Sequence, residues 1–449
     1  MAATVGLPSE GQKRPWKRAA AWLALLGPLF FLTYGAANEL AALRTDVPSV
    51  VFHWEHHIPF LAWTIIPYWS IDALYAVSLF LCTSRAGLDT HARRLLTAQV
   101  NAVACFIAFP LKFAWAKPET SGVAGVLFDA LASFDKPFNQ APSLHIALLV
   151  VLWDLYSKHV PRGWHWLLHA YFALIGVSVL TTWQHHFIDV PTGALLGLFC
   201  LWLWPDSHPA PLAGAQFTRD RARLRLAAAY LGGALACALL AGYLGGWALW
   251  LFWPAVSLLL VALAYAALGA AAFQKDACGV MSFAARCLLW PYCLAAWINS
   301  RAWTRGLPKA VEVAAPVWLG RMPAASGNTF SSVVDLTAEL PAPARAARWW
   351  AFPALDLVTP ASRLLSEAAA AIERETVLAS TGGGRVLVCC AVGFSRSAAA
   401  LATWLASTGR SRNAAEAIAT VKAARPEVVL GADHQLAIEQ ALLLRKDPA

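Results

Sequence analysis

The stretch Leu226–Gln274 reads LAAAYLGGALACALLAGYLGGWALWLFWPAVSLLLVALAYAALGAAAFQ and contains no Asp, Glu, Lys or Arg in 49 residues. One straight helix of that length would be far longer than a bilayer is thick, because an α-helix rises about 1.5 Å per residue and the hydrocarbon core spans about 30 Å. We therefore predict a transmembrane hairpin that turns at Gly245-Gly246.

The composition of the whole chain is also typical of a membrane protein. Of its 449 residues, 59% are hydrophobic and 14% are charged, and 22 are Trp. Soluble domains carry about 25% charged residues, and Trp gathers where a membrane meets water. The net charge of +9 fits basic loops next to anionic lipid, so we expect no nucleic-acid partner. The composition excludes a disordered chain and an ordinary soluble enzyme.

Six further apolar runs precede the hairpin. The first, Ala19–Asn38, is 20 uncharged residues long and predicts an uncleaved first span. Lys and Arg gather in alternate loops, which the positive-inside rule assigns to the cytoplasm. We expect about eight spans in all, in a multi-pass protein of the cell inner membrane, with the C-terminal domain in the cytoplasm and residues 39–57, 112–142 and 185–187 outside. The six runs lie at about 19–38, 58–83, 93–111, 143–156, 164–184 and 188–204, with Asp72 inside the second.

The texture of the sequence changes after the hairpin. Cys287–Trp303 is apolar and rich in Trp but is broken by Pro291, which predicts an interfacial helix on the inner leaflet. From about residue 310, the β-branched runs Ser332–Leu336 and Arg385–Cys389 alternate with helical patterns, which predicts a small α/β domain. The helical patterns cover about 361–378, 396–408, 413–424 and 433–445. The predicted organisation is a membrane domain at 1–208, an additional hairpin at 209–275, an interfacial linker at 276–309 and a cytoplasmic domain at 310–449.

The nine cysteines give no sign of a disulfide framework or a zinc site. Most lie in apolar stretches, as small core residues do. They form neither a spaced extracellular pattern nor paired C-x-x-C clusters. We expect no structural disulfide, no metal and no other cofactor.

Three polar clusters fall at the outward ends of the predicted spans, and their side chains suit phosphoryl transfer. Lysines and a hydroxyl can hold phosphate oxygens, and one histidine can attack phosphorus while a carboxylate fixes its tautomer. A second histidine can protonate the leaving oxygen. His185 and Asp189 are four residues apart and share a face if that segment is helical. The clusters are formed by Lys112 and Lys117, by Ser143 and His145, and by His185 and Asp189.

This set resembles the type 2 phosphatidic acid phosphatase superfamily over roughly residues 20–205. That family carries the motifs K-x6-R-P, P-S-G-H and S-R-x5-H-x3-D, and this chain carries P-S-L-H and H-x3-D. The resemblance implies a six-helix core in which His185 is the nucleophile, Asp189 orients it and His145 is the general acid. It also implies phosphate binding by Lys112, Lys117 and Ser143.

The match departs from the family at three places. The first motif is shortened to K-x4-K-P, Val179 stands where Arg is expected, and Leu144 replaces Gly. These changes leave fewer basic side chains in the phosphate-binding site than the family motifs supply. The combination of P-S-L-H with H-H-x-x-D is similar to the inositol phosphorylceramide synthase branch, which transfers a phospho-headgroup instead of hydrolysing it.

A second site is predicted in the α/β domain by Val386-Leu-Val-Cys-Cys-Ala-Val-Gly-Phe-Ser-Arg-Ser397, which reads as strand, tight loop and helix. Such a loop points backbone N–H groups at an anion above a helix N-terminus. The same field favours the thiolate form of Cys390 as a nucleophile. Arg396 can hold two phosphate oxygens in a fork, Ser397 can hydrogen-bond the thiolate, and Gly393 allows the loop to close around phosphate.

This motif resembles the dual-specificity branch of the protein tyrosine phosphatase superfamily, over about residues 315–445. Val333–Pro341 is similar to an early strand of members that act on phosphatidylglycerophosphate or phosphoinositides, and Arg425-Pro426 is similar to a later segment. The resemblance implies that Asp356, 34 residues before Cys390, is the general acid. Cys389 stands where the family has a loop-ordering His, either as a small core residue or as a redox partner of Cys390.

Together the two sites predict a bifunctional membrane phosphatase. The histidine site would face the periplasm and the cysteine site the cytoplasm, so the expected partners are the bilayer and phosphorylated lipids. Two alternatives stay open. The membrane site could be a phospho-headgroup transferase, and the C-terminal domain could be a lipid-phosphate phosphatase or a non-catalytic phosphate sensor.

Overall fold

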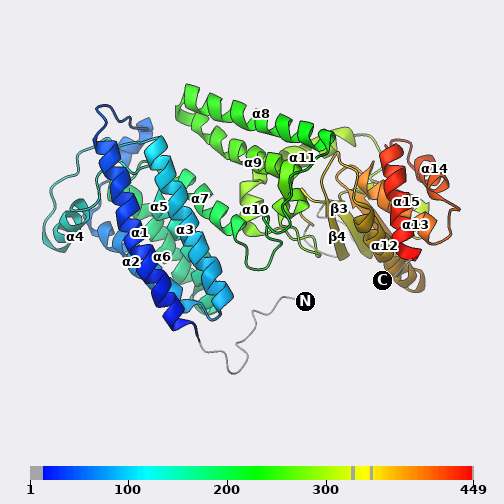
Figure 1. Ribbon diagram of the computed structural model, residues 1–449, viewed down its shortest axis with the longest axis horizontal. Helices are drawn as coiled ribbons and strands as arrows, with labels where there is room; N and C mark the ends of the chain where they lie inside the picture. The colour runs from blue at the N-terminus through cyan, green and yellow to red at the C-terminus, as the bar shows by residue number, and fades with distance from the viewer. Residues whose placement is uncertain (1–13, 325–328, 344–346, 447–449) are drawn as a thin grey trace. The chain divides into compact units, whose positions relative to one another are not determined.

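The structure is a computed structural model that describes residues 14–324, 329–343 and 347–446 (Figure 1). The chain divides into two units with separate internal packing. Unit 1 comprises Met1–Ser207 and Leu240–Trp250, and unit 2 comprises His208–Leu239 and Leu251–Ala449. The predicted domain boundaries are not tested by this division and stay predictions.

Unit 1 is an all-helical bundle, and the six predicted runs of its sequence are helices with shifted ends. The segment 112–142, which is predicted as a loop, contains helix α4. This helix has 11 residues and is too short for a span. The helices are α1 (Trp16–Ala42), α2 (Ile65–Leu81), α3 (Arg85–Ala108), α4 (Gly122–Ala132), α5 (Leu144–His159), α6 (His165–Thr181) and α7 (Asp189–Leu203).

Helices α5 and α7 approach each other closely because glycine lines their contact. A Cβ atom on Gly193 would lie 2.5 Å from the carbonyl oxygen of Ser143, and one on Gly197 would lie 2.7 Å from the carbonyl oxygen of Ala147. Larger side chains at these two positions would force the helices apart. The backbone N–H of Ser143 donates to the carbonyl of Asp189 at 3.1 Å, so the two helix starts lie side by side.

Five helical segments in the described residues are long and apolar enough to cross a membrane, which indicates membrane association. Helices α5 and α7, with 16 and 15 residues, are shorter than the roughly 20 residues that a span needs, and α3 carries charged residues. The count of eight spans and their orientation therefore stay predictions. The five segments are Trp16–Ala42, Ala62–Leu81, Arg162–Thr181, Arg221–Leu244 and Gly246–Phe273.

The long uncharged stretch turns at Gly245-Gly246, as its sequence predicts. Helix α8 (Arg221–Leu244) ends there, and both glycines have positive φ angles, of 58° and 51°, which side chains disfavour. The return segment is not one regular helix. It consists of a 3₁₀ turn, α9, a π-helical turn and a second 3₁₀ turn, at Gly246–Leu251, Phe252–Leu263, Ala264–Leu268 and Gly269–Phe273.

Unit 2 contains a five-stranded mixed sheet in the order β1-β2-β5-β3-β4, in which only β1 is antiparallel to its neighbour. The sequence predicts β3 and β5, but it misses the other three strands, each of which contains a proline or glycine or ends two residues from one. The strands are β1 (Ala310–Ala314), β2 (Val317–Arg321), β3 (Ser332–Thr337), β4 (Arg348–Ala354) and β5 (Val386–Cys390).

Helices cover the sheet, and the four predicted at the C-terminus are all present. Val386, Val388 and Cys390 of β5 point into the main core beneath these helices, whereas Leu387 and Cys389 point into a smaller core on the other face. This alternation follows from the two-residue period of a strand. The helices are α10 (Phe283–Leu288), α11 (Trp290–Trp303), α12 (Ser362–Gly382), α13 (Arg396–Ser407), α14 (Ala414–Ala424) and α15 (Ala432–Lys446).

Candidate functional site

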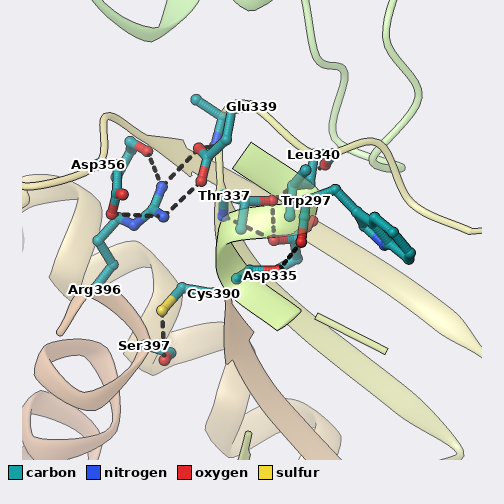
Figure 2. A network of polar contacts seen from close by, with 12 residues as sticks. Trp297, Asp335, Thr337, Glu339, Leu340, Asp356, Cys390, Arg396 and Ser397 are labelled. Carbon is teal, nitrogen blue, oxygen red and sulfur yellow. Dashed lines mark hydrogen bonds and ion pairs between the residues drawn. The ribbon is translucent and has the colours of Figure 1, made fainter. Parts of the chain in front are cut away.

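The predicted cysteine loop joins the end of β5 to the start of α13. The Sγ atom of Cys390 accepts a hydrogen bond from the hydroxyl of Ser397 at 3.2 Å (Figure 2). It accepts a second one, also at 3.2 Å, from the backbone N–H of Gly393. Gly393 has a φ of +82°, and a Cβ atom there would lie 2.6 Å from the backbone carbonyl of Gly320. Position 393 therefore requires glycine, both for its positive φ angle and for its close approach to Gly320. The structure brings the sulfur, the loop N–H groups and the first turn of α13 into one cradle.

Arg396, the first residue of α13, is buried and bound by two carboxylates (Figure 2). Its Nη2 and Nη1 atoms lie 2.7 and 2.8 Å from the two carboxylate oxygens of Glu339. Nη2 also lies 2.9 Å from Oδ1 of Asp356, and Nη1 donates to the carbonyl of Ala354 at 2.8 Å. The Nε–H group has no partner among the described residues, so it is a free donor for an incoming anion.

The two carboxylates around Arg396 differ in exposure and in the direction in which their pKa values are shifted. Glu339 is 2% exposed, and although burial alone would raise its pKa, the ion pair with Arg396 lowers it. The side chain of Asp356 is 40% exposed, yet desolvation raises its pKa, helped by the charge of Glu339 and opposed by Arg396. Glu339 is thus a fixed partner of the guanidinium. Asp356 is the partner that a phosphate can displace and that can carry a proton.

Cys389 lies on the opposite face of the sheet from the cradle. It is fully buried in the smaller core and pairs in register with Asp335 of β3. Burial, together with the Asp335 carboxylate, raises the pKa of its thiol well above the ordinary value. Both Cys389 and Cys390 are free thiols. The position fits a small core residue, and only Cys390 faces the phosphate cradle.

Sequence reasoning missed two residues that support the cradle. Glu339 lies inside the segment Val333–Pro341 and has no local signal for its role, because its contact with Arg396 spans 57 residues of sequence. Arg425 is buried and donates to the carbonyls of Leu319 and Val392 at 3.4 and 3.3 Å, which braces the loop from beneath. The Arg425-Pro426 pair was the only sequence signal for this role.

In unit 1 the structure brings His185, Asp189 and Ser143 together. Nδ1 of His185 lies 3.2 Å from Oδ2 of Asp189, and Nε2 lies 3.1 Å from the hydroxyl of Ser143. Asp189 also accepts the backbone N–H of His186 at 2.9 Å, which fixes its carboxylate. With Nδ1–H directed at Asp189, Nε2 is the unprotonated nitrogen and accepts the hydroxyl of Ser143, so it can act as a nucleophile once that hydroxyl turns to a substrate oxygen. All three side chains are buried.

Two of the predicted phosphate ligands lie differently with respect to His185. Nζ of Lys117 donates to the side chain of Gln184 at 2.7 Å, next to the histidine. Although Lys117 is exposed overall, desolvation of its ammonium lowers its pKa to about 8. Lys112 is exposed, and its backbone forms hydrogen bonds with the carbonyl of Pro48 and the hydroxyl of Ser49. Lys117 therefore belongs to the candidate site, and Lys112 lies outside its network in the described part of the chain.

His145 and His185 both line a cavity of about 300 Å³ in unit 1. The ring of His145 stacks on Tyr68 with a centroid distance of 4.2 Å, and its Nε2 atom has no hydrogen-bond partner among the described residues. Most of the lining is apolar, and Asp72 and Asp135 are its carboxylates. The cavity can hold part of a hydrophobic substrate beside the two histidines.

His186, by contrast, has a structural environment. Its Nε2 accepts the backbone N–H of Ala114 at 3.0 Å, and its Nδ1 lies 3.0 Å from Glu55. The ring also stacks on Phe113. Both ring nitrogens are thus occupied by protein groups, and His186 packs the loops around the site.

The similarity of this chain to known proteins is confined to solved structures that cover part of its length. No protein-family model matches it, and no curated protein matches it. Among solved structures, it is similar to the active form of Tk-PTP (25% identity, TM-score 0.27, covering 30% of this chain and 97% of that chain). It is also similar to human DUSP28, with 26% identity and a TM-score of 0.27, covering 31% of this chain and 97% of that chain. PTPMT1 in complex with PI(5)P is 15% identical, with a TM-score of 0.27, covering 31% of this chain and 100% of that chain.

Proposed function

We propose that unit 2 is a cysteine-dependent phosphatase. The observation that carries this proposal is the cradle in which Cys390, Gly393, Arg396 and Ser397 converge at the start of α13. Its backbone N–H groups, helix N-terminus and guanidinium favour a dianionic phosphate directly in front of the sulfur. Among the described residues of unit 2, no other thiol lies in this cradle, since Cys389 faces the smaller core on the other side of the sheet.

The arrangement supports a two-step reaction at phosphorus. The thiolate of Cys390 forms an S–P bond while the P–O bond to the leaving group breaks, and Asp356 gives its proton to the departing oxygen. Water then attacks phosphorus, Asp356 takes a proton from it, and the S–P bond breaks to release inorganic phosphate. Ser397 hydrogen-bonds the sulfur as it leaves. The guanidinium of Arg396 balances charge on the phosphoryl oxygens in both steps.

We propose a phosphorylated lipid as the substrate of this site. The support is the set of five apolar helices that indicates membrane association, two of which come before the cysteine domain in the sequence, separated from it by α10 and α11. A monoester in a lipid headgroup is then at high local concentration. We also propose that the protein lies in an inner membrane and that residues 310–449, the part of unit 2 that holds the cysteine site, lie in the cytoplasm.

We also propose that unit 1 carries a second phosphoryl-transfer site on the outer side of the membrane. His185 attacks phosphorus, Asp189 holds its tautomer, and His145 protonates the leaving oxygen from across the cavity. Ser143 and Lys117 bind phosphate oxygens. Water as the final acceptor makes this site a hydrolase, and a lipid alcohol in the apolar cavity makes it a headgroup transferase.

The test uses the purified full-length protein in lipid nanodiscs, with a panel of phosphorylated lipids and an aryl phosphate. Released phosphate and lipid transfer products are measured side by side for the wild type, Cys390→Ser, His185→Ala and the double variant. We expect Cys390→Ser to abolish the phosphate release that depends on unit 2, His185→Ala to abolish the activity of the unit 1 site, and the double variant to show neither. Phosphate binding to unit 2 without turnover would favour a sensor, and a labelled headgroup on a second lipid would favour a transferase.

Sidedness is tested separately, by labelling engineered thiols in intact cells. A cysteine placed at Glu119 should react with an impermeant reagent, whereas one placed at Asp433 should react only after permeabilisation. Labelling of both from outside would contradict the proposed topology.

A further inference from the structure

Lys275, two residues after the candidate span Gly246–Phe273, is completely buried in unit 2. Its ammonium lies 2.5 Å from Oδ2 of Asp335 and donates to the carbonyl and hydroxyl oxygens of Thr337, both at 2.8 Å. It also donates to the carbonyl of Leu340 at 2.6 Å. A buried charge with this many fixed partners holds those partners in one arrangement.

The partners of Lys275 surround the residue that orients the catalytic arginine. Asp335, Thr337 and Leu340 belong to the end of β3 and the turn that follows it, and Glu339 lies in the same turn (Figure 2). The backbone N–H of Thr337 donates to the carboxylate of Asp335 at 2.8 Å, which fixes the end of β3 where the turn begins. Lys275 therefore fixes the segment from which Glu339 reaches Arg396.

Tyr265 makes a comparable contact with the loop of the proposed general acid. It lies in the π-helical turn of the same candidate span and is 1% exposed. Its hydroxyl donates to the backbone carbonyl of Asp356 at 2.9 Å. The next residue, Leu357, has a φ of +57°, so the chain reverses there in a conformation that side chains disfavour. The hydrogen bond from Tyr265 holds Asp356 at this bend.

Both acidic partners of Arg396 are thus placed by one stretch of 11 residues, Tyr265–Lys275. We propose that Tyr265 and Lys275 are positioning residues of the cysteine site, and that the candidate membrane span Gly246–Phe273 is in this way a working part of the phosphatase. The inference rests on the proposed function of unit 2 and extends it. Catalysis is coupled to the folding of the span, and a fragment that begins at residue 306 lacks both positioning residues.

The test compares two tyrosine variants of the full-length protein in nanodiscs. Tyr265→Phe removes the hydroxyl that holds Asp356, whereas the control Tyr230→Phe removes a hydroxyl from the neighbouring ring, 5.3 Å away between centroids. We measure kcat for an alkyl phosphate, whose poor leaving group needs a proton, and for an aryl phosphate, which needs one less. Loss of one positioning hydrogen bond should lower the alkyl-to-aryl ratio of kcat about 5–10-fold in Tyr265→Phe and leave it unchanged in Tyr230→Phe.

A double variant separates positioning from general loosening of the fold. In an Asp356→Asn background, Tyr265→Phe should not lower the ratio further, because no acid remains to be positioned. Equal loss on both substrates, or an unchanged ratio in Tyr265→Phe, would overturn the inference while the proposed function stands. Absence of cysteine-dependent turnover in the wild type would overturn both.

Discussion

Glu339 and Arg396 form a two-point ion pair of 2.7 and 2.8 Å in which both side chains are buried. The pair holds the guanidinium at the mouth of the cysteine loop before any substrate arrives. A preset guanidinium costs little reorganisation when charge develops on a transferring phosphoryl group.

Removing the negative charge of Glu339 should therefore impair catalysis beyond the loss of stability that an equally buried carboxylate elsewhere would cause. Hydrogen bonds to charged groups contribute roughly 1.5–3 kcal/mol, so we expect Glu339→Gln to lower kcat/KM for an aryl phosphate about 10–100-fold. Glu375→Gln is the matched control, since Glu375 is equally buried but pairs with Arg348 and Trp350. Equal activity of Glu339→Gln and the control would show that Arg396 needs no such partner.

Asp356 competes with substrate for Arg396, which predicts opposite effects on binding and rate. A half-exposed ion pair is worth up to about 1 kcal/mol, so Asp356→Asn should bind vanadate or inorganic phosphate roughly 2–5-fold more tightly. Loss of the general acid should at the same time slow turnover of an alkyl phosphate by about 100-fold or more. Inhibition constants and kcat measured on the same preparation check both. Weaker anion binding by Asp356→Asn would contradict the competition.

The pH dependence of the cysteine site should reflect the raised pKa of Asp356. A general acid works when protonated, so kcat/KM for an alkyl phosphate should fall as pH rises through this pKa. Because desolvation raises the pKa, that fall should occur at higher pH than an ordinary aspartate would give. The descending limb should disappear in Asp356→Asn. A limb of unchanged position in that variant would assign it to another group.

Lys275 should be essential for the stability of unit 2. Removing one member of a buried ion pair typically costs about 3–5 kcal/mol, so Lys275→Met should lower the unfolding free energy of unit 2 by that order. Unfolding can be followed by limited proteolysis of the detergent-solubilised protein across a urea series. The control is Lys309→Met, because Lys309 is exposed. Equal resistance of the two variants would mean that the contacts of Lys275 contribute little.

Local patterns in the sequence predict much of this architecture, because their physical signals are local. Apolar runs predict the helices of unit 1, and the spacing of Cys390 and Arg396 predicts a cradle that depends on one strand end and one helix start. The short spacing of His185 and Asp189 also allows their contact, but the turn before α7 makes it, because α7 begins only at Asp189 and the two residues do not share a helical face.

The contacts that sequence reasoning missed join distant segments. Glu339 reaches Arg396 over 57 residues, Lys275 reaches Asp335 over 60, and Tyr265 reaches Asp356 over 91. No periodicity connects such pairs. No pattern in the sequence around Lys275 marks it as part of the cysteine domain, because it comes two residues after the end of a candidate span.

The most direct test of the central claim is phosphate release by the full-length protein in nanodiscs that contain a phosphomonoester lipid. The His185→Ala variant, which retains Cys390, is compared with the His185→Ala variant that also carries Cys390→Ser. The account predicts steady release of inorganic phosphate by the protein that retains Cys390 and none by Cys390→Ser, while phosphate still binds to the latter through the loop and Arg396. Equal release by the two proteins would contradict the cysteine mechanism.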